Sequence, residues 1–515
     1  MLQKHPHLHA TLIIRRDAQG NWQSEGEAHA RLGYRVSGTQ ASPGEGVWAE
    51  WDWDGQTLTF ENERFGFYSV FYARIGDGIG LSTSATELVR AGASANLDDA
   101  AIAVFLRMGY YVGDDTPFQA VRLLPPGCRL TWAGGEFRIE QHAPPIPTTA
   151  STLSRDEAVR QYGVIFQEAV EQMLPSEEDR MCVPLSAGRD SRHILYALVR
   201  AGRRPDMVLT GMSPPPRPST DAEVASEITS RLQLPHSIIE LSDNRFDDEL
   251  TKDILTSFCA DEHGQMLPIA NFIRDNQFDV SWDGIAGDIF SCGVYNDTKM
   301  LDQFRNRQFT DLSSWLLDAE GYLPSYLCSD AYQRWNRDLA TERLNRELEL
   351  YCDLPNPAAP FFFYNRVRRE LALSPFGIMN QRTQILAPYL WHRLFDMLIN
   401  LPFEYFKGRE FHSEAIDQFY TELPHVRYVS TETGNVQERF DRIRRFARRM
   451  GRYSLQNSRS QSCIRNSFLL PRLGKAYLNR SYGTEVPVLF SRILVMLHLE
   501  RYVSEQGTIR AAPRA

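Results

Sequence analysis

The sequence predicts an α/β protein with a β-rich N-terminal domain and a C-terminal domain built on a parallel sheet. Three observations lead to this prediction. Residues 1–140 contain short segments of β-branched and aromatic residues, separated by turn pairs such as Asp54-Gly55. From residue 155 to about residue 282, strand-like and helix-like segments alternate at short spacing. Beyond residue 300 the pattern is mostly helical.

The predicted N-terminal domain covers residues 1–145 and contains strands and one helix. The helix is expected over residues 98–110 (DDAAIAVFLRMGY), because two acidic residues at its start favour a helix N-terminus. The segment 142–154 (HAPPIPTTASTLS) is rich in proline, serine and threonine and predicts a linker. The clearest strands are expected at residues 10–15, 46–53, 57–61 and 69–73.

The predicted C-terminal domain covers residues 155–515 and begins with an amphipathic helix over residues 155–174. Alternating strands and helices predict a parallel sheet with crossover helices. The strands are expected at residues 182–185, 206–210, 237–241 and 279–282, and the helices at 191–201, 221–232 and 266–278.

Composition narrows the class of protein. The chain has 515 residues and a formal net charge of -9 at pH 7, so we expect no nucleic-acid partner. Its seven cysteines are scattered without a CxxC pair, which is typical of reduced thiols in a cytoplasmic protein. No apolar run approaches about 18 residues, so we expect neither a signal peptide nor a membrane partner. The basic run 440–452 (FDRIRRFARRMGR) is either a solvated helix face or a surface for an anionic partner.

A small-residue turn within residues 183–192 (VPLSAGRDSR) is the first candidate for chemistry. A strand-like run ends there, and a helical pattern follows. Backbone N–H groups in such a turn can approach an anion, and the helix N-terminus adds partial positive charge. Asp190 then needs a counter-charge, most simply a Mg²⁺ ion held between its carboxylate and phosphates. The alternative is a helix cap made by Ser186 or Asp190.

A second Gly-rich turn follows another predicted strand, within residues 280–293 (VSWDGIAGDIFSCG), and Asp288 lies at its centre. In a parallel sheet both turns would open at the same edge, where ligands of doubly wound sheets bind. We therefore expect Asp190 and Asp288 to share a metal ion. The alternative is two unrelated acidic residues in loops.

Five stretches, in collinear order, resemble segments of asparagine synthetases and their relatives. LSAGRDS (185–191) resembles the LSGGxDS pyrophosphate loop of that family, and GIAGDIFSCG (284–293) is similar to its second nucleotide motif. ILAPYLWHRLFDMLINLP (385–402) resembles the family segment R-V-P-F-L-D-H-R-L…L-P. In the first domain, WDWDGQTLTFENERFGFYSVFY (51–72) and RLLPPG (122–127) resemble two further blocks.

This resemblance implies a fold and an activity. The implied fold is a truncated Ntn-hydrolase-like domain followed by an adenine-nucleotide α-hydrolase-like (PP-loop) synthetase domain. Members of the family use ATP and Mg²⁺ to adenylate a carboxylate with release of pyrophosphate, and an amine then displaces AMP to form an amide. Backbone donors and the metal ion take up the charge of the phosphates.

The resemblance also assigns roles to residues of this chain. The metal would be held by Asp190 and Asp288. The catalytic candidates are Asp190, Asp288, Arg189, Tyr351 and Gln384. ATP would contact the first turn, the strand end 208–212 beside the adenine, and the second turn, through Leu185, Ser186, Ala187, Gly188, Asp190, Ser191, Leu209, Gly211, Gly284 and Gly287.

The amine is not expected to come from glutamine. Asparagine synthetases begin with Met-Cys, and that cysteine is their glutaminase nucleophile, whereas this chain begins Met-Leu-Gln and its first cysteine is Cys128. Branches of the family without the thiol close β-lactams, close the macrolactam of lasso peptides, or amidate sugar acids and other intermediates. The short first domain and the early nucleotide loop are most similar to a lasso-peptide cyclase, whose partners would be a precursor peptide and its protease. A small metabolite amidated with ammonia and a catalytically degenerate binding protein are the alternatives.

Several positions depart from the family pattern. Ala187 replaces a glycine and is acceptable only if its φ stays negative. Gln384 aligns with a family glutamate, and because an amide cannot accept a proton as a base, the β-lactam interpretation is weakened. Arg189 and Arg192 either clamp phosphate or form surface ion pairs. The family's late lysine has no clear counterpart, and the nearest cations in the sequence are Lys407 and Arg427.

Other residues have both functional and structural interpretations. Asp261 and Glu262 lie where relatives have an acidic segment near the substrate. The segment 365–370 (NRVRRE) either lines a substrate pocket or forms a buried ion-pair cluster. His193 is expected to be a packing or capping residue, and His412 lacks the spacing of a zinc ligand.

Overall fold

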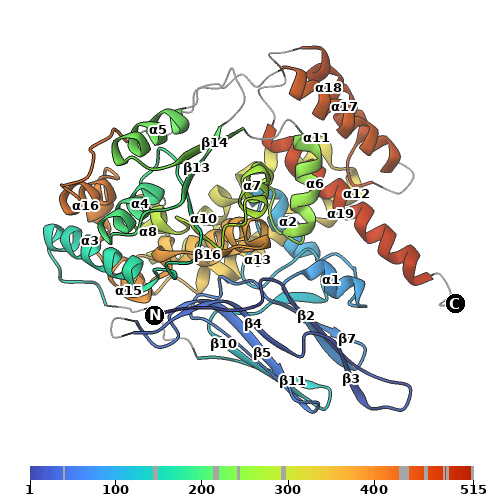
Figure 1. Ribbon diagram of the computed structural model, residues 1–515. Coiled ribbons are helices and arrows are strands. Elements are labelled where there is room, and N and C mark those ends of the chain that lie inside the picture. Colours follow the sequence, from blue (N-terminus) through green and yellow to red (C-terminus); the bar gives the residue numbers. More distant parts are fainter. Residues whose placement is uncertain are drawn as a thin grey trace.

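The computed structural model describes residues 1–38, 41–142, 146, 149–212, 220–240, 244–291, 297–428, 440–457, 462–479, 482 and 487–511. The N-terminal part consists of antiparallel sheets, and the C-terminal part consists of a parallel sheet with helices, as the sequence predicted. Figure 1 shows the antiparallel sheets at the bottom of the molecule, with the helical C-terminal part above them.

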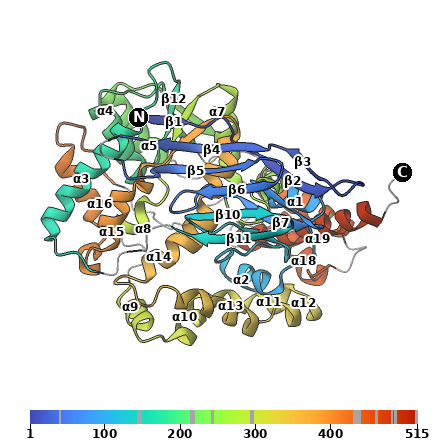
Figure 2. The same cartoon turned by 90° about the horizontal axis from the view of Figure 1, so that it is seen from below.

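Two antiparallel sheets form the N-terminal part, in the orders β1-β4-β5-β6-β10-β11 and β3-β2-β8-β7-β9. Their facing sides meet through aromatic pairs, such as Trp22 with Trp132 at 4.8 Å and Tyr72 with Phe137 at 5.5 Å between ring centroids. Figure 2 shows the strands of the larger sheet side by side. The strands are β1 (Leu2–Lys4), β2 (Thr11–Arg16), β3 (Trp22–Gly26), β4 (His29–Val36), β5 (Gly46–Trp53), β6 (Thr57–Asn62), β7 (Phe71–Ile75), β8 (Gly78–Ser82), β9 (Val121–Leu123), β10 (Cys128–Ala133) and β11 (Glu136–Gln141).

The C-terminal sheet has the order β14-β13-β12-β15-β16, and all of its pairs are parallel. Right-handed crossovers place α4 and α5 on one side of this sheet, and the return to β15 places α7 on the other. Since β12 and β15 are neighbours, the segments that follow them emerge side by side. The strands are β12 (Met181–Pro184), β13 (Met207–Met212), β14 (His236–Glu240), β15 (Val280–Trp282) and β16 (Gln384–Leu386).

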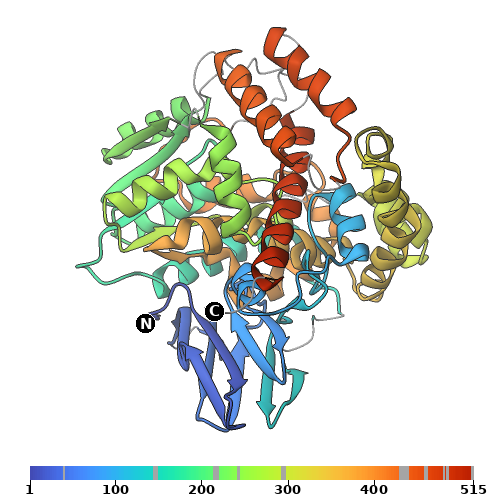
Figure 3. The same cartoon turned by 90° about the vertical axis from the view of Figure 1, so that its right-hand side faces the viewer.

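Helices surround the parallel sheet and extend to the far end of the molecule. The last helix, α19, packs against α6 and reaches α1 of the N-terminal part, where the Tyr502 hydroxyl donates to Thr86 O at 2.8 Å (Figure 3). The helices are α1 (Ala85–Arg90), α2 (Asp99–Met108), α3 (Arg155–Gln172), α4 (Asp190–Arg200), α5 (Thr220–Leu232), α6 (Arg245–Leu255), α7 (Leu267–Asp275), α8 (Gly287–Ser291), α9 (Thr298–Arg305), α10 (Phe309–Leu316), α11 (Leu323–Tyr326), α12 (Ser329–Arg334), α13 (Arg337–Glu349), α14 (Ala358–Phe362), the π-helix η3 (Phe363–Leu371), α15 (His392–Ile399), α16 (Phe411–Phe419), α17 (Phe440–Asn457), α18 (Asn466–Leu478) and α19 (Pro487–Ala511).

The elements expected from the sequence lie within a few residues of those observed. The strand β4 escaped prediction because Gly33 interrupts its pattern; its φ is +78°, and a Cβ there would lie 3.0 Å from the Tyr68 ring. The strand β16 was also missed, because three residues give no periodicity. Part of the expected linker, residues 143–145 and 147–148, lies outside the described residues. No helix among the described residues is long and apolar enough to cross a membrane.

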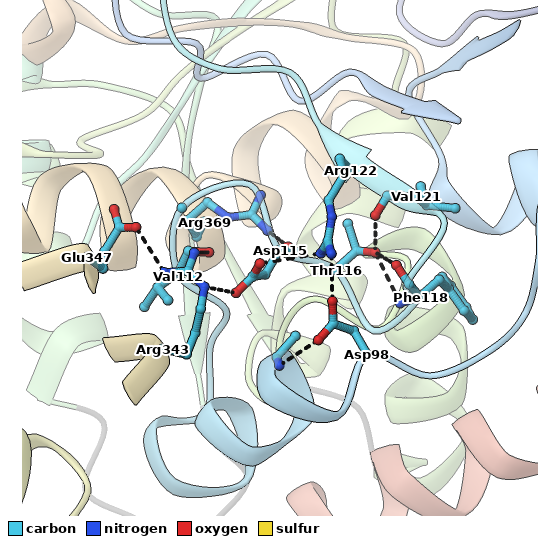
Figure 4. Close-up of polar contacts among 12 residues, drawn as sticks. Asp98, Val112, Asp115, Thr116, Phe118, Val121, Arg122, Arg343, Glu347 and Arg369 are labelled. Atoms are coloured by element: carbon cyan, nitrogen blue, oxygen red, sulfur yellow. Dashed lines mark hydrogen bonds and ion pairs between the residues drawn. The ribbon is translucent and has the colours of Figure 1, made fainter. Parts of the chain in front are cut away.

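A buried polar cluster joins the N-terminal part to the helices. Asp115, in the loop that follows α2, accepts hydrogen bonds from Arg343 of α13 at 2.8 Å and from Arg122 of β9 at 3.3 Å (Figure 4). Arg369 of η3 donates to the backbone oxygen of the same aspartate. Burial raises the pKa of Asp115 to about 6 even though Arg343 opposes the shift. Two elements that are distant in sequence, α13 and η3, therefore meet at this loop beside β9.

The π-helix η3 makes a second connection across the same interface. Arg368 is buried and donates to Gly66 O at 3.1 Å and to Leu124 O at 2.7 Å, both in the N-terminal part. Nearby, Arg64 forms two hydrogen bonds with Asp396 of α15, at 2.7 and 2.9 Å. The arginines at 368 and 369 therefore bind the two parts of the chain together through backbone oxygens, which is a buried structural role but not the ion-pair cluster that was one of the two interpretations.

Replacing Arg343 with alanine should destabilise the protein, because Asp115 would lose its closest cation and stay buried. Breaking one side of a buried ion pair costs about 3–5 kcal/mol. Urea and thermal unfolding, followed by circular dichroism, measure this loss.

The matched control is Arg346→Ala on the same helix. The side chains of Arg346 and its partner Glu342 are 66% and 68% exposed, so the loss should stay below about 1 kcal/mol. Equal losses in both variants would show that the buried cluster does not hold the interface.

Candidate functional site

The two Gly-rich turns meet at the carboxyl edge of the parallel sheet. Asp190 is the first residue of α4, after β12, and Asp288 lies in the first turn of α8, after β15. The two strands are adjacent and pair in register from Met181 with Val280. The carboxylates of Asp190 and Asp288 are close enough for the charge of Asp288 to raise the pKa of Asp190. The structure thus brings together the two aspartates that the sequence paired.

The glycines of the second turn make room for Asp190. A Cβ at Gly284 would lie 2.8 Å from Asp190 Cβ, and one at Gly287 would lie 2.6 Å from Asp190 Cγ. Real side chains do not approach so closely, and both positions therefore require glycine. Between them, Ala286 has a φ of +70°, a left-handed conformation that costs an alanine of order 1 kcal/mol. The turn is therefore a strained segment closely packed against the first loop.

Three carboxylates crowd this edge of the sheet. Burial and the charges of Asp288 and Asp283 raise the pKa of Asp190, although Arg189 opposes the shift. Burial also raises the pKa of Asp283 to about 6. Desolvation raises the pKa of Asp288 against the pull of Arg366 and Arg409. A divalent cation would relieve this repulsion.

One carboxylate oxygen of Asp190 is available to bind a metal ion. Asp190 Oδ1 is buried and has no recorded hydrogen bond among the described residues, although His412 Nδ1 lies 3.3 Å from it. Unpartnered carboxylate oxygens are costly, and hard cations such as Mg²⁺ bind to them readily. Asp190 and Asp288 are therefore the residues of this edge that fit a metal ion.

The first turn is closed by its own neighbours. Ser186 N–H donates to Ser191 Oγ at 3.1 Å, and Gly188 N–H donates to Ser186 Oγ at 3.2 Å. Ala187 N–H donates to Asp221 Oδ1, on α5, at 2.7 Å. The backbone of Ala187 is not in the left-handed region, so its methyl group is tolerated. An anion entering the turn would take over these three N–H groups from side chains.

The two arginines of the turn have different roles. Arg192 is buried, and its guanidinium donates to Val426 O at 2.5 Å and to Arg427 O at 3.0 Å. Both expectations for Arg192, a phosphate clamp or a surface ion pair, were wrong, because its side chain turns inward onto a later loop. Arg189 lies 5.3 Å from the ring of Tyr428 and acts electrostatically on Asp190. Arg189 therefore remains a candidate for contact with an anion.

The other predicted nucleotide-binding residues in this region lie just after β12 (Leu185) or on the neighbouring strand β13 (Leu209 and Gly211). Leu185 is buried, and its N–H donates to Leu209 O at 2.7 Å. Gly211 pairs with Ile239 of β14 near the carboxyl end of β13. These residues border the first turn on the side away from Asp288, since β13 and β15 flank β12.

Sequence reasoning missed a buried aromatic and imidazole cluster beneath the two turns. His412 Nδ1 lies 2.9 Å from Ser291 Oγ and 3.3 Å from Asp190 Oδ1. Its Nε2 lies 3.1 Å from His193 Nδ1 and 3.3 Å from the Tyr389 hydroxyl. Burial, with the charge of Arg189, lowers the pKa of His412 to about 3, so the ring is neutral at physiological pH. In the sequence, only the segment 387–392 (APYLWH), which follows β16, pointed to this cluster, because it contains Tyr389.

An acidic cluster is connected to Asp288 through a shared cation, Arg366. Single oxygens of Asp261, Glu262 and Glu370 lie within 4.8 Å of one another. Arg366 Nε lies 3.5 Å from Glu370 Oε2 and also lowers the pKa of Asp288. Burial and the two neighbouring carboxylates raise the pKa of Glu370 well above its usual range. Arg366 therefore acts on both Asp288 and Glu370.

Two predicted catalytic residues lie away from the paired aspartates. Gln384 pairs with Val280, at the amino end of the sheet, whereas Asp190 and Asp288 lie beyond the carboxyl end. The hydroxyl of Tyr351 lies 3.2 Å from Asn365 Nδ2 and 3.5 Å from Oε1 of Glu347, which is on α13. No contact recorded for the described residues joins either side chain to the two turns.

Lys407 and Arg427, the two cations named as substitutes for the family's late lysine, are not the cations recorded as acting on Asp288. Lys407 Nζ lies over the ring of Phe403 at 5.1 Å, and the backbone oxygen of Arg427 accepts from Arg192. Arg366 and Arg409 are the cations that lower the pKa of Asp288.

Comparisons with models of known protein families and with curated proteins found no match for this chain.

Replacing Gly287 with alanine should disturb the site, because the new methyl group would overlap Asp190 and approach Tyr389 Cε2 to 3.0 Å. Overpacking of this kind costs about 1–3 kcal/mol, measured as a lower midpoint of thermal or urea unfolding.

Gly474→Ala in α18 provides the comparison, because nothing lies within 4 Å of a Cβ there and alanine is the better helix former. That variant should be as stable as the parent protein or more so. If both substitutions were neutral, the close packing of the two turns would be refuted.

Proposed function

We propose that the protein is an ATP-dependent ligase that adenylates a substrate carboxylate, releases pyrophosphate, and joins the acyl group to an amine not taken from glutamine. The observation that carries this proposal is the pairing of Asp190 and Asp288 on adjacent Gly-rich turns at the carboxyl edge of a parallel sheet. Ligands of open parallel sheets bind at that edge. The finer fold assignment, an Ntn-hydrolase-like part followed by a PP-loop part, belongs to the same proposal.

ATP would lie across the two turns. In this arrangement the N–H groups of Ser186, Ala187 and Gly188, with the N-terminus of α4, would bind the pyrophosphate portion. Bound Mg²⁺ would neutralise the phosphates and polarise the α-phosphorus toward the attacking carboxylate. Asp190 and Asp288 would hold the ion, while Arg189 and Arg409 would offset the remaining negative charge. The adenine would lie toward Leu209 and Gly211.

The acidic cluster suits the second half of the reaction. Asp261, Glu262 and Glu370 would attract an ammonium group to a position near Asp288. An amine held there would lose its proton to a nearby carboxylate and attack the activated acyl group. We propose a precursor peptide that is closed into a macrolactam as the substrate. Amidation of a sugar acid or another small metabolite with ammonia is the alternative.

A glutaminase role is not part of the proposal. The thiol of Cys128 is buried on β10, and burial raises its pKa to about 12. A thiol in that state is not a nucleophile at neutral pH.

A second candidate is a nucleotide-binding protein without catalytic activity. It is favoured by the closed first turn, in which Asp221 already accepts the Ala187 N–H, and by the position of Gln384 at the opposite end of the sheet. It would bind ATP and release neither AMP nor pyrophosphate with any carboxylate and amine pair. The two candidates therefore differ in turnover but agree in nucleotide binding.

Calorimetric titration with ATP tests the proposal in its most basic form. Wild-type protein should bind ATP in the presence of Mg²⁺, and Asp190→Asn and Asp288→Asn should each weaken binding by at least tenfold. The physical reason is that an amide oxygen carries no charge and is a poorer ligand for a hard cation.

Asp353→Asn is the matched control, because the Asp353 side chain is 86% exposed. It should bind Mg²⁺ and ATP as the wild type does. If the wild type bound no ATP, or if both aspartate variants bound it normally, the proposed function would be wrong.

A further inference from the structure

We infer that His412 is a positioning residue that fixes both Gly-rich turns through one tautomer, with the proton on Nδ1. The inference rests on the proposed function, because it concerns how the metal-binding carboxylate of Asp190 is held. It adds a residue on α16 to a site otherwise made by the ends of β12 and β15. Nothing in the spacing of the sequence places His412 there.

The tautomer follows from the neighbours of each ring nitrogen. Ser291 Oγ donates its own proton to Gly287 O, so toward His412 Nδ1 it can only accept. The carboxylate of Asp190, 3.3 Å from Nδ1, is also an acceptor. An N–H is therefore required at Nδ1.

The opposite nitrogen lies near two groups that can donate to it, the Tyr162 hydroxyl and the His193 ring, and near the Tyr389 hydroxyl, whose proton goes to Asp190 O. His412 Nε2 lies 3.1 Å from His193 Nδ1, 3.2 Å from the Tyr162 hydroxyl and 3.3 Å from the Tyr389 hydroxyl. The other nitrogen of His193, Nε2, has no hydrogen-bond partner among the described residues, so the contact with His412 is the hydrogen bond recorded for that ring. The acceptors at Nδ1 therefore select the proton position of His412, and the Tyr162 and His193 contacts at Nε2 are compatible with it.

This single ring connects the two turns. Through Ser291 it holds Gly287 O, the start of α8 on which Asp288 lies. On the other side, Tyr389 donates to Asp190 O at 3.1 Å and also contacts His412 Nε2. His412, Tyr162, His193 and Ser291 are fully buried, so water does not compete for these contacts. Loss of the Nδ1 proton donor would release Asp190 and α8 together.

Two isosteres separate the two ring nitrogens. In His412→Asn the amide N–H₂ can occupy the place of Nδ1, and in His412→Gln the amide group lies near the place of Nε2. We expect calorimetry to show Mg²⁺-dependent ATP affinity within about threefold of wild type for His412→Asn. For His412→Gln we expect a loss of about 10–100-fold, the range typical of residues that orient metal ligands.

Tyr420→Phe is the matched control within the same cluster. The Tyr420 ring packs 5.4 Å from His193, and its hydroxyl donates to Gln167 Oε1 at 3.1 Å, away from His412. This variant loses a buried hydroxyl group and should keep wild-type affinity for Mg²⁺ and ATP. Equal losses in the Asn, Gln and Tyr420 variants would mean that only packing matters, and would overturn the inference.

Nitrogen NMR of histidine-labelled wild-type protein provides a readout independent of nucleotide. We expect His412 to show a protonated Nδ1 and an unprotonated Nε2, assigned by comparison with the His412→Asn spectrum. A protonated Nε2 would overturn the inference and leave the proposed function standing. If wild-type protein bound no ATP while the Nδ1 proton was observed, the proposed function would fail and the tautomer assignment would stand.

Discussion

The repulsion among three carboxylates at one edge of the parallel sheet is the constraint on which the rest of the site depends. Asp190, Asp283 and Asp288 are desolvated there, and each has a raised pKa. The turns nevertheless hold Asp190 against backbone that only glycine permits, and a neutral imidazole lies beside it. Asp190 Oδ1 is thus buried with no recorded hydrogen bond and with a neutral imidazole 3.3 Å away, so nothing among the described residues neutralises it fully, and the proposed cation would do so.

Neighbouring residues of the π-helix η3 have two different roles, one at the interface with the N-terminal part and one near the acidic cluster. Arg368 and Arg369 point toward the N-terminal part and bind its backbone oxygens, whereas Arg366 and Glu370 face the acidic cluster. A π-helical turn advances side chains by a different angle from an α-helix, and such turns are frequent at functional sites. Because these residues share one helix, a movement of Arg368 and Arg369 at the interface with the N-terminal part would also move Arg366 and Glu370.

The sequence was sufficient for the parallel sheet and for the pairing of Asp190 with Asp288, because alternating segments and Gly-rich turns are local signals. It was insufficient for residues whose role depends on long-range packing. His412 lies on a helix that begins more than a hundred residues after α8, and no periodicity connects it to Ser291. Arg192 was misread because a charged residue next to a loop is usually exposed, and only the structure shows the carbonyl oxygens that bury it. Gln384 was aligned by motif order, which does not record the end of the strand on which a residue lies.

The buried guanidinium of Arg368 bears on how the chain can be divided. Its two acceptors, Gly66 O and Leu124 O, both lie in loops of the N-terminal part, and Arg64 of that part binds Asp396 of α15. If residues 155–515 were produced alone, a charged group would be left in an apolar surface without acceptors. The β-rich part therefore supplies hydrogen-bond acceptors and a cation that the helical C-terminal part needs, which gives it a structural reason to persist whether or not it binds a ligand of its own.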